Sequence, residues 1–210
     1  MSSVTWALGK TIGALMLFAV AGCSGLGKVP PIPQQLDIGA PVESVVKTTV
    51  TDGRVVSTLV IPPVTAPAIL QGVGVVWRMG PDGAPNRYAT YEWSAAPESL
   101  VHERLIDRLS QNFAILVDAV SSDNLTLHVN LLQFEQVYAP DGTGNQGVVS
   151  VQAVLLRSGE VLGQYRASER VSADSNDAPA GARALRTATN QMADNIATWM
   201  MRVAPKQIGR

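Results

Sequence analysis

Cysteine is almost absent from this chain, because Cys23 is the only one in 210 residues. A single cysteine cannot form an intramolecular disulfide, so the covalent staple of many small secreted domains is excluded. Only two histidines accompany it, His102 and His128. A zinc site made of cysteines and histidines at ligand spacing is therefore excluded as well. Any folded domain in this sequence must be held together by its apolar core.

The chain also lacks an excess of charge of either sign. It has 16 Lys and Arg against 17 Asp and Glu, for a formal net charge of −1. Nothing in this balance favours nucleic acid or a polybasic membrane surface as a partner. The catalytic signatures G-x-S-x-G and H-E-x-x-H are missing too. We therefore expect a protein that is not an enzyme, without a dissociable cofactor or a metal.

The N-terminus has the features of a secretory signal. Lys10 precedes an apolar run of ten residues, Thr11–Val20, which is too short for the roughly 20 residues of a membrane-spanning helix. No second apolar run reaches that length. The run ends in Val20-Ala21-Gly22-Cys23, and the chain then becomes polar and rich in proline and glycine. This order resembles the lipobox of bacterial lipoproteins, in which the thiol after the cleavage point carries a diacylglyceryl group.

The lipobox predicts that residues 1–22 are a signal peptide and that Cys23 is lipidated with diacylglycerol and an N-acyl chain. An ordinary signal peptide cut nearby, with Cys23 incidental, is the alternative. More than one acyl chain is needed for stable anchoring, which such a modification supplies. Ser24 follows the cysteine where an aspartate, in enterobacterial lipoproteins, would favour the inner membrane. We expect a lipid anchor in the inner leaflet of the outer membrane, with the protein facing the periplasm.

The mature chain divides into a tether and one domain. Residues 23–41 contain four prolines and several glycines, which predicts an extended tether. Residues 42–210 are enough for a single domain with its own core. In this domain, Asp52-Gly53 lies between two β-prone runs and predicts a hairpin. Strands are expected at residues 45–50, 54–61, 73–79, 87–93, 124–137, 148–157 and 161–171.

Two helices complete the predicted fold. Pro97 suits the first turn of a helix, and apolar residues at spacings of three and four continue to about Gln111. A second apolar seam runs from Ala178 to Val203 and includes Ile196 and Trp199, which we expect to be buried. The fold class is α+β: a mostly antiparallel sheet with both helices packed on one face and a long C-terminal helix. In the strand 124–137 the apolar residues change face, which predicts a bulge or two-sided burial.

Several candidate sites have simpler explanations. His102 and His128 fall on a helix and on a polar strand face, and are expected to be surface or edge residues. Gly142–Gly147 spells G-x-G-x-x-G, but a strand follows it where a nucleotide site needs a helix. We expect a hairpin connection there.

Aromatic residues gather in and around the third and fourth predicted strands, at Trp77, Tyr88, Tyr91 and Trp93. They can belong to the core, where such residues are common. They can also form a recognition patch, since Trp and Tyr are enriched where proteins bind each other. Trp77, Tyr91 and Trp93 are the candidate partner-binding residues.

The middle of the chain carries a family resemblance. The residues that carry it are, in order, VIPPVTAPAIL at Val60–Leu70, GVGVVW at Gly72–Trp77, Asn86-Arg87-Tyr88, Trp93 with Pro97, and Leu105 and Leu109 in the helix. With the lipobox and the strand, hairpin, strand and long helix that follow, this order resembles the ABC-type transport auxiliary lipoproteins (paraquat-inducible protein C-like lipoproteins). The resemblance covers most of residues 55–203.

The resemblance implies a function beside an MCE-type lipid transporter. Such a system has an inner-membrane permease, an ATPase and MCE-domain proteins that form a periplasmic conduit for phospholipid between the two membranes. The lipoprotein would dock the end of that conduit at its own membrane, and matching symmetry favours a homo-oligomer. The alternatives are an outer-membrane assembly lipoprotein, working on lipopolysaccharide or outer-membrane proteins, and a periplasmic lipid hydrolase.

Overall fold

The structure is a computed structural model that describes residues 32–40, 57–116 and 124–204. Residues 33–210 form one compact unit, which contains every helix and strand reported below. In the described ranges, no helix combines the length and the apolar character that crossing a bilayer requires. The elements in chain order are β1 (Gln34–Leu36), β2 (Thr58–Val60), the short 3-10 helix η1 (Ala68–Leu70), β3 (Gly74–Met79), β4 (Asn86–Trp93), α1 (Pro97–Leu109), β5 (Ala114–Leu116), β6 (Leu125–Tyr138), β7 (Asn145–Arg157), β8 (Glu160–Ser172) and α2 (Ala178–Val203).

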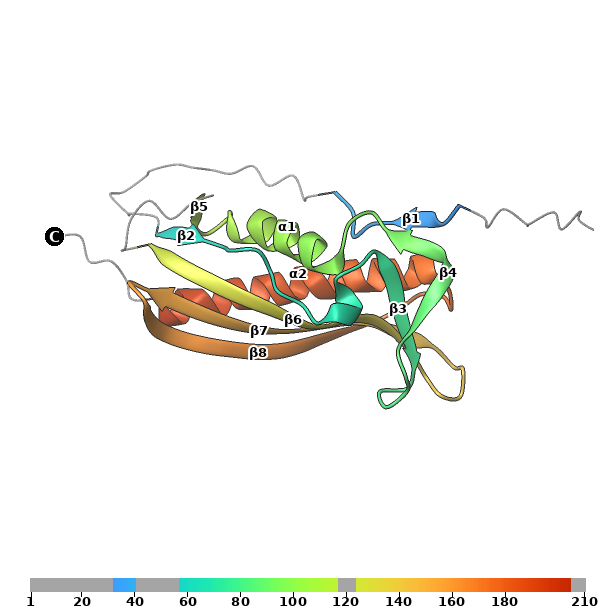
Figure 1. Cartoon of the computed structure of the whole chain (residues 1–210). Helices are drawn as coiled ribbons and strands as arrows, with labels where there is room; N and C mark the ends of the chain where they lie inside the picture. Colours follow the sequence, from blue (N-terminus) through green and yellow to red (C-terminus); the bar gives the residue numbers. More distant parts are fainter. Residues whose placement is uncertain (1–31, 41–56, 117–123, 205–210) are drawn as a thin grey trace, which may run out of the picture. The chain divides into compact units, whose positions relative to one another are not determined.

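All eight strands of the described residues belong to one mixed sheet that branches at β6 (Figure 1). One edge of β6 pairs with β7 along its whole length, and β7 pairs with β8, both antiparallel. The other edge of β6 pairs in parallel with β2 at its start and with β3 at its end. From β2 the sheet continues to β5, and from β3 it continues through β4 to β1. The predicted α+β fold with a mostly antiparallel sheet is confirmed.

The change of face predicted for the strand at residues 124–137, which is β6, is a bulge. The register between β6 and β7 shifts between Leu131 and Gln133, so that Leu132 is the extra residue. Leu127, Val129 and Leu131 before it, and Phe134 after it, are all buried. Because Leu132 is an extra residue, the side chains that point inward change from odd-numbered to even-numbered positions along β6. This is the change of face that the sequence pattern predicted.

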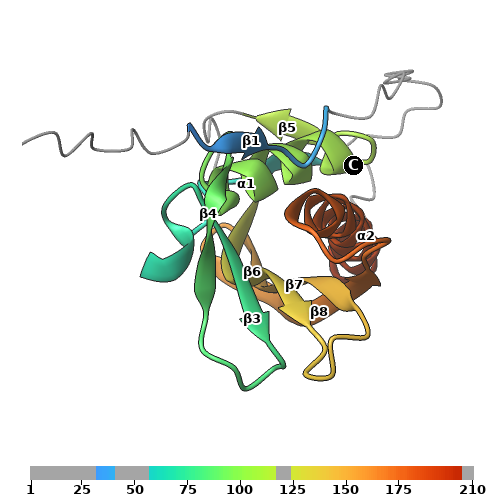
Figure 2. The ribbon, with the colours of Figure 1, turned by 90° about the vertical axis from the view of Figure 1, so that its right-hand side faces the viewer.

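The two helices lie on the inner side of the curved sheet (Figure 2). α2 packs on β7 and β8 through a face made largely of alanine, so that its backbone comes close to the sheet. A Cβ on Gly147 of β7 would lie 2.5 Å from the backbone nitrogen of Leu185, closer than atoms approach. Ile196 is fully buried and Trp199 is 7% exposed, stacked on Tyr165 at 5.4 Å, which confirms their predicted burial.

α1 is bound to α2 on one side and to the N-terminal segment on the other. Its Arg108 forms an ion pair with Asp194 of α2. Its buried Arg104 donates hydrogen bonds to the carbonyl oxygens of Ile38 and Gly39, at 2.9 and 2.6 Å. A buried guanidinium needs hydrogen-bond acceptors nearby. The segment that follows β1 supplies them, and these hydrogen bonds hold it against the core.

The structure differs from the sequence expectations in three places. Gln34–Leu36 lies within the expected tether but forms β1, which pairs in parallel with β4. β5 was not expected at all, and α1 ends at Leu109 rather than near Gln111. Of the expected hairpin at 45–61, only the end is described, and its strand β2 pairs in parallel with β5 and β6.

Candidate partner-binding surface

The predicted anchor lies outside the described residues. Cys23, the lipobox residues Val20, Ala21 and Gly22, and the sorting residue Ser24 all precede residue 32, where the description begins. Lipidation at Cys23 remains a prediction.

Trp93 belongs to the core and not to the surface. Its side chain is 1% exposed and packs edge-on against Phe134, with ring centroids 5.3 Å apart. Trp93 is the last residue of β4, just before the chain passes to α1. A partner that binds the folded protein therefore cannot contact Trp93, which leaves Trp77 and Tyr91 as the candidate partner-binding residues.

Trp77 and Tyr91 are half-buried, and two other tyrosines join them into a continuous aromatic cluster. Trp77 contacts Tyr88 and Tyr138 with centroid distances of 6.0 and 5.9 Å, and Tyr88 contacts Tyr91 at 5.9 Å. Tilted and edge-on rings at these distances attract each other. We call Trp77, Tyr88, Tyr91 and Tyr138 the aromatic cluster. Tyr138 comes from β6, and only the parallel pairing of β3 with β6 brings it here.

Hydrogen bonds hold the aromatic cluster in place from beneath. The Tyr88 hydroxyl lies 2.7 Å from Oε1 of Gln136 and 2.5 Å from the Tyr138 hydroxyl. Burial raises the pKa of the Tyr88 phenol far above its usual value, and the hydrogen bond to Tyr138 raises it further, so the group stays neutral and can donate. The buried Gln136 in turn donates from Nε2 to Oδ1 of Asn145 and to the carbonyl oxygen of Asp177, at 2.6 and 3.0 Å.

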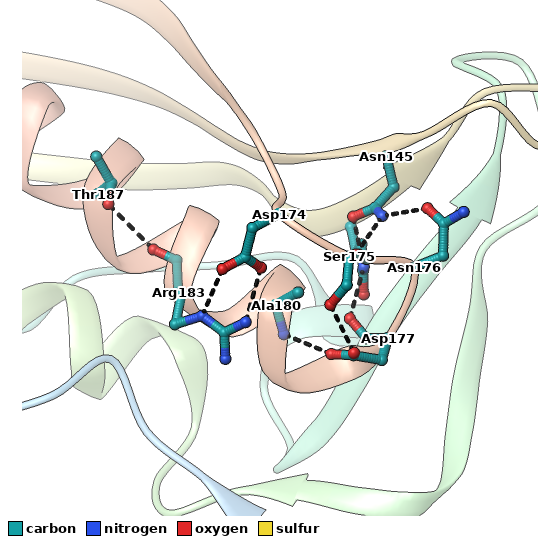
Figure 3. Close-up of polar contacts among 9 residues, drawn as sticks. Asn145, Asp174, Ser175, Asn176, Asp177, Ala180, Arg183 and Thr187 are labelled. Atoms are coloured by element: carbon teal, nitrogen blue, oxygen red, sulfur yellow. Dashed lines mark hydrogen bonds and ion pairs between the residues drawn. The ribbon is translucent and has the colours of Figure 1, made fainter.

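The same chain of hydrogen bonds reaches the start of α2 (Figure 3). Asn145 donates to the carbonyl oxygen of Ser175 and to Oδ1 of Asn176, both at 2.8 Å. Asp177 caps the helix by accepting from the backbone nitrogen of Ala180 at 2.7 Å, and the Ser175 hydroxyl donates to its other oxygen. These hydrogen bonds, that of the Ser175 side chain first, hold the pKa of Asp177 below its usual range.

Two hairpin tips stand side by side (Figures 1 and 2), and Tyr138 of the aromatic cluster ends the strand that leads into one of them. The tip between β3 and β4 and the tip between β6 and β7 both contain Pro-Asp-Gly, at residues 81–83 and 140–142. They are joined where the backbone nitrogen of Gly80 donates to the carbonyl oxygen of Tyr138 at 2.8 Å. A hollow of about 450 Å³ opens here, and Gly80, Tyr138, Pro140 and Asn145 are among the residues that line it. We call the segment between β3 and β4 and the segment between β6 and β7 the paired hairpin tips. Met79, the last residue of β3, is 47% exposed.

The remaining sequence candidates have structural roles or none. His102 is half-buried with Nε2 3.0 Å from the carbonyl oxygen of Ile61, and His128 is exposed on β6. The G-x-G-x-x-G segment spans the turn between β6 and β7 and the first three residues of β7, so it is the expected hairpin connection. In the described part of the chain, no three side chains of His, Cys, Asp or Glu come together as a metal site would need.

Comparison with known proteins places this fold in a family. The family model described as "ABC-type transport auxiliary lipoprotein component" matches residues 40–197. One similar solved structure, described only as an uncharacterized protein, has 18% identity and a TM-score of 0.65, and the match covers 80% of this chain and 99% of that one. Another, a DUF330 protein from Xanthomonas campestris, has 19% identity and a TM-score of 0.61, over 70% of this chain and 85% of the other. At these identities the similarity establishes the fold. No curated protein matches the chain.

Proposed function

The chain belongs to the ABC-type transport auxiliary lipoprotein family, and from that premise we propose that it is a non-enzymatic docking subunit of an ABC-type lipid transporter. Its partner in this proposal is an MCE-domain protein that carries phospholipid between the inner and outer membranes, together with the permease and ATPase of that system. The lipoprotein is anchored through lipid on Cys23 in the outer membrane and faces the periplasm.

The family match carries this proposal, because it spans nearly all of the folded unit and names an auxiliary component of a transporter. The lipobox at Val20–Cys23 adds the anchor that a lipoprotein requires. An auxiliary subunit works by binding, and binding to another protein needs a preorganised surface more than it needs a reactive group.

The aromatic cluster and the paired hairpin tips supply such a surface. Half-buried Trp and Tyr side chains give a large contact area at low entropic expense, and they are enriched at the centres of interfaces. Gln136 and Asn145 fix the cluster to the start of α2, so the aromatic rings are held before a partner arrives. We propose that the MCE-domain partner docks here, and repetition of this contact in a homo-oligomer would add avidity.

The two alternatives make different demands on the protein. A periplasmic lipid hydrolase needs a nucleophile beside a general base. One ring nitrogen of His102, on α1, contacts a main-chain carbonyl oxygen. The other histidine, His128, is exposed on β6. An outer-membrane assembly lipoprotein would use a similar binding surface with other partners. The neighbouring genes separate these proposals, since only the first requires a permease, an ATPase and an MCE protein beside this gene.

The direct test is capture of the MCE protein encoded beside this gene by the full-length lipoprotein in detergent. We expect binding to weaken at least tenfold in Trp77→Ala and Tyr91→Ala and to survive in His102→Ala and His128→Ala. Thermal unfolding of each variant identifies any loss that comes from misfolding.

Crosslinking in cells tests the same surface without changing the aromatic side chains. A photoreactive residue in place of Thr143, at the exposed hairpin tip, should crosslink to the MCE protein. The same residue in place of Met201, which is 52% exposed on α2, should not. If neither capture nor crosslinking finds the MCE protein, the docking proposal fails and the assembly lipoprotein takes its place.

A further inference from the structure

β8 is a long strand that pairs with one other strand of the described residues. It spans 13 residues and pairs with β7, and among the described residues no strand or loop pairs with its other edge. The other ends of the sheet, β1 and β5, are three residues long. Natural proteins keep edge strands short or distorted because an open edge pairs with other chains. Here the one register shift lies near the start of β8, opposite Leu155 and Leu156, so pairing is regular from Gly163 to Ser172.

The outer face of β8, away from the helices, is positively charged. Arg166 and Arg170 lie on it with Ser168 between them, since the alternate residues Tyr165 and Ala167 face the core. Neither arginine has a hydrogen bond or an ion pair with any described residue. The third arginine nearby, Arg78 of β3, pairs at 2.7 Å with Glu135, whose side chain is 3% exposed. The two arginines of β8 therefore give this face a net positive charge.

A hollow of about 450 Å³ lies on the outer face beside these arginines. The Ser150 hydroxyl lines this hollow, 3.1 Å from Oε1 of Gln133 and 2.8 Å from the Ser168 hydroxyl. Arg78, Arg166 and Arg170 line it as well. Arginines around a hydroxyl-lined hollow are suited to carboxylates, because each guanidinium can donate two parallel hydrogen bonds.

The inner side of the same edge is apolar. Tyr165, Ala167 and Val171 pack against the core but stay partly exposed. A strand added beside them would bury this surface with its own apolar residues. Glu169 lies in the same row and already accepts a hydrogen bond from Asn195 at 2.9 Å, so a carboxylate is disfavoured on this side.

A second copy of this chain is a poor occupant of the edge. In an antiparallel pair related by a two-fold axis, outer-face residues lie opposite outer-face residues. Whichever residue from 165 to 171 lies on the axis, an arginine at 166 or 170 comes directly opposite, or diagonally next to, an arginine of the other copy. Like charges at these positions destabilise the pairing.

We propose that β8 binds an extended segment of a partner protein as a ninth strand, and that this segment alternates acidic and apolar residues. The acidic residues face Arg166 and Arg170, and the apolar residues extend the row of Tyr165, Ala167 and Val171. A peptide suits the site better than a small anion does, because the open backbone edge lies beside the hollow and needs N–H and C=O partners. This site is separate from the aromatic cluster and does not depend on the docking proposal.

The test measures binding of a labelled nine-residue peptide of alternating valine and glutamate to the full-length lipoprotein in detergent micelles, by fluorescence anisotropy. Arg166→Glu with Arg170→Glu should weaken this binding at least tenfold and should create binding to the matched peptide of valine and lysine. Misfolding cannot produce that exchange of preference. Arg87→Glu with Arg186→Glu, an equal charge change at exposed positions of β4 and α2, should leave binding unchanged.

Backbone pairing is tested with two peptides that carry N-methyl groups on alternate residues, in opposite phases. Only the phase that blocks the N–H groups facing β8 should abolish binding. Equal binding of the glutamate and lysine peptides, or no effect in either phase, overturns the proposal. In a further outcome, the peptide fails to bind while inorganic phosphate, or vesicles containing phosphatidylglycerol, bind in an Arg166-dependent way. That result overturns the added strand and assigns the hollow to phosphate groups.

Discussion

Gly147→Ala tests how closely α2 and the sheet must approach each other. The added Cβ would lie 2.5 Å from the backbone nitrogen of Leu185 and 2.7 Å from the carbonyl carbon of Ala184, where ordinary contacts begin at 3.4 Å. Backbone atoms of a helix cannot rotate aside as a flexible side chain can. The start of α2 must therefore move away from β7 by about 1 Å, which forfeits a quarter to a half of the dispersion attraction across that gap.

The expected loss follows from what that movement disturbs. Leu185 and Ala188, on the face of α2 that would move, are at most 1% exposed, so their packing is loosened as well. Overpacking of this kind costs about 1–3 kcal/mol, and a clash with backbone belongs at the upper end of that range. The lower entropy of the unfolded alanine variant offsets about 0.4–1 kcal/mol. We expect a net loss of about 2 kcal/mol in the free energy of unfolding.

Urea unfolding followed by far-UV circular dichroism measures this loss. With a slope of about 2 kcal/mol/M, the midpoint should fall by about 1 M. Gly144→Ala is the matched control, because a Cβ at Gly144 meets nothing within 4 Å. Its midpoint should stay within about 0.3 M of the wild type or rise slightly. If the two variants unfold alike, the close approach of α2 to β7 is wrong.

Three further predictions concern the anchor, the far end of α2 and its cap. Cys23→Ala should abolish palmitate labelling and membrane retention, and a variant that keeps both would contradict the lipobox. Trp199→Ala should cost about 3–5 kcal/mol in urea unfolding, and Trp199→Phe clearly less because a ring still stacks on Tyr165; a loss below about 1 kcal/mol for alanine would place Trp199 outside the core. The lowered pKa of Asp177 contributes stability that is fully present above about pH 4 and is lost as the pH falls through the lower folded value. Asp177→Asn still caps the helix, so melting temperatures measured from about pH 2 to 6 should show a weaker decline in acid than the wild type; an unchanged pH profile would argue against this role.

The sequence predicted the elements whose stabilising contacts repeat along the chain. α2 runs from Ala178 to Val203 as its apolar seam indicated, and the bulge at Leu132 follows from a change of face within one strand. β1 and β5 were missed because three residues are too few for a periodic pattern, and their partners lie far away in the sequence. The alternation in β4 could not tell whether Trp93 points inward, since that depends on which face the helices cover. Tyr138 was missed because β3 and β6 pair in parallel, and parallel strands are not joined by a short turn that the sequence would reveal.

The branching of the sheet at β6 also bears on how the chain folds as it is made. β2 and β3 bind to opposite ends of one edge of β6, so neither finds that partner before residues 125–138 have been synthesised. β6, β7, β8 and α2, in contrast, follow one another in the chain and contact one another at shorter sequence separations. Local contacts form faster than distant ones. We therefore expect the C-terminal half to form first and to be the template on which the earlier half assembles, in the reverse of the order of synthesis.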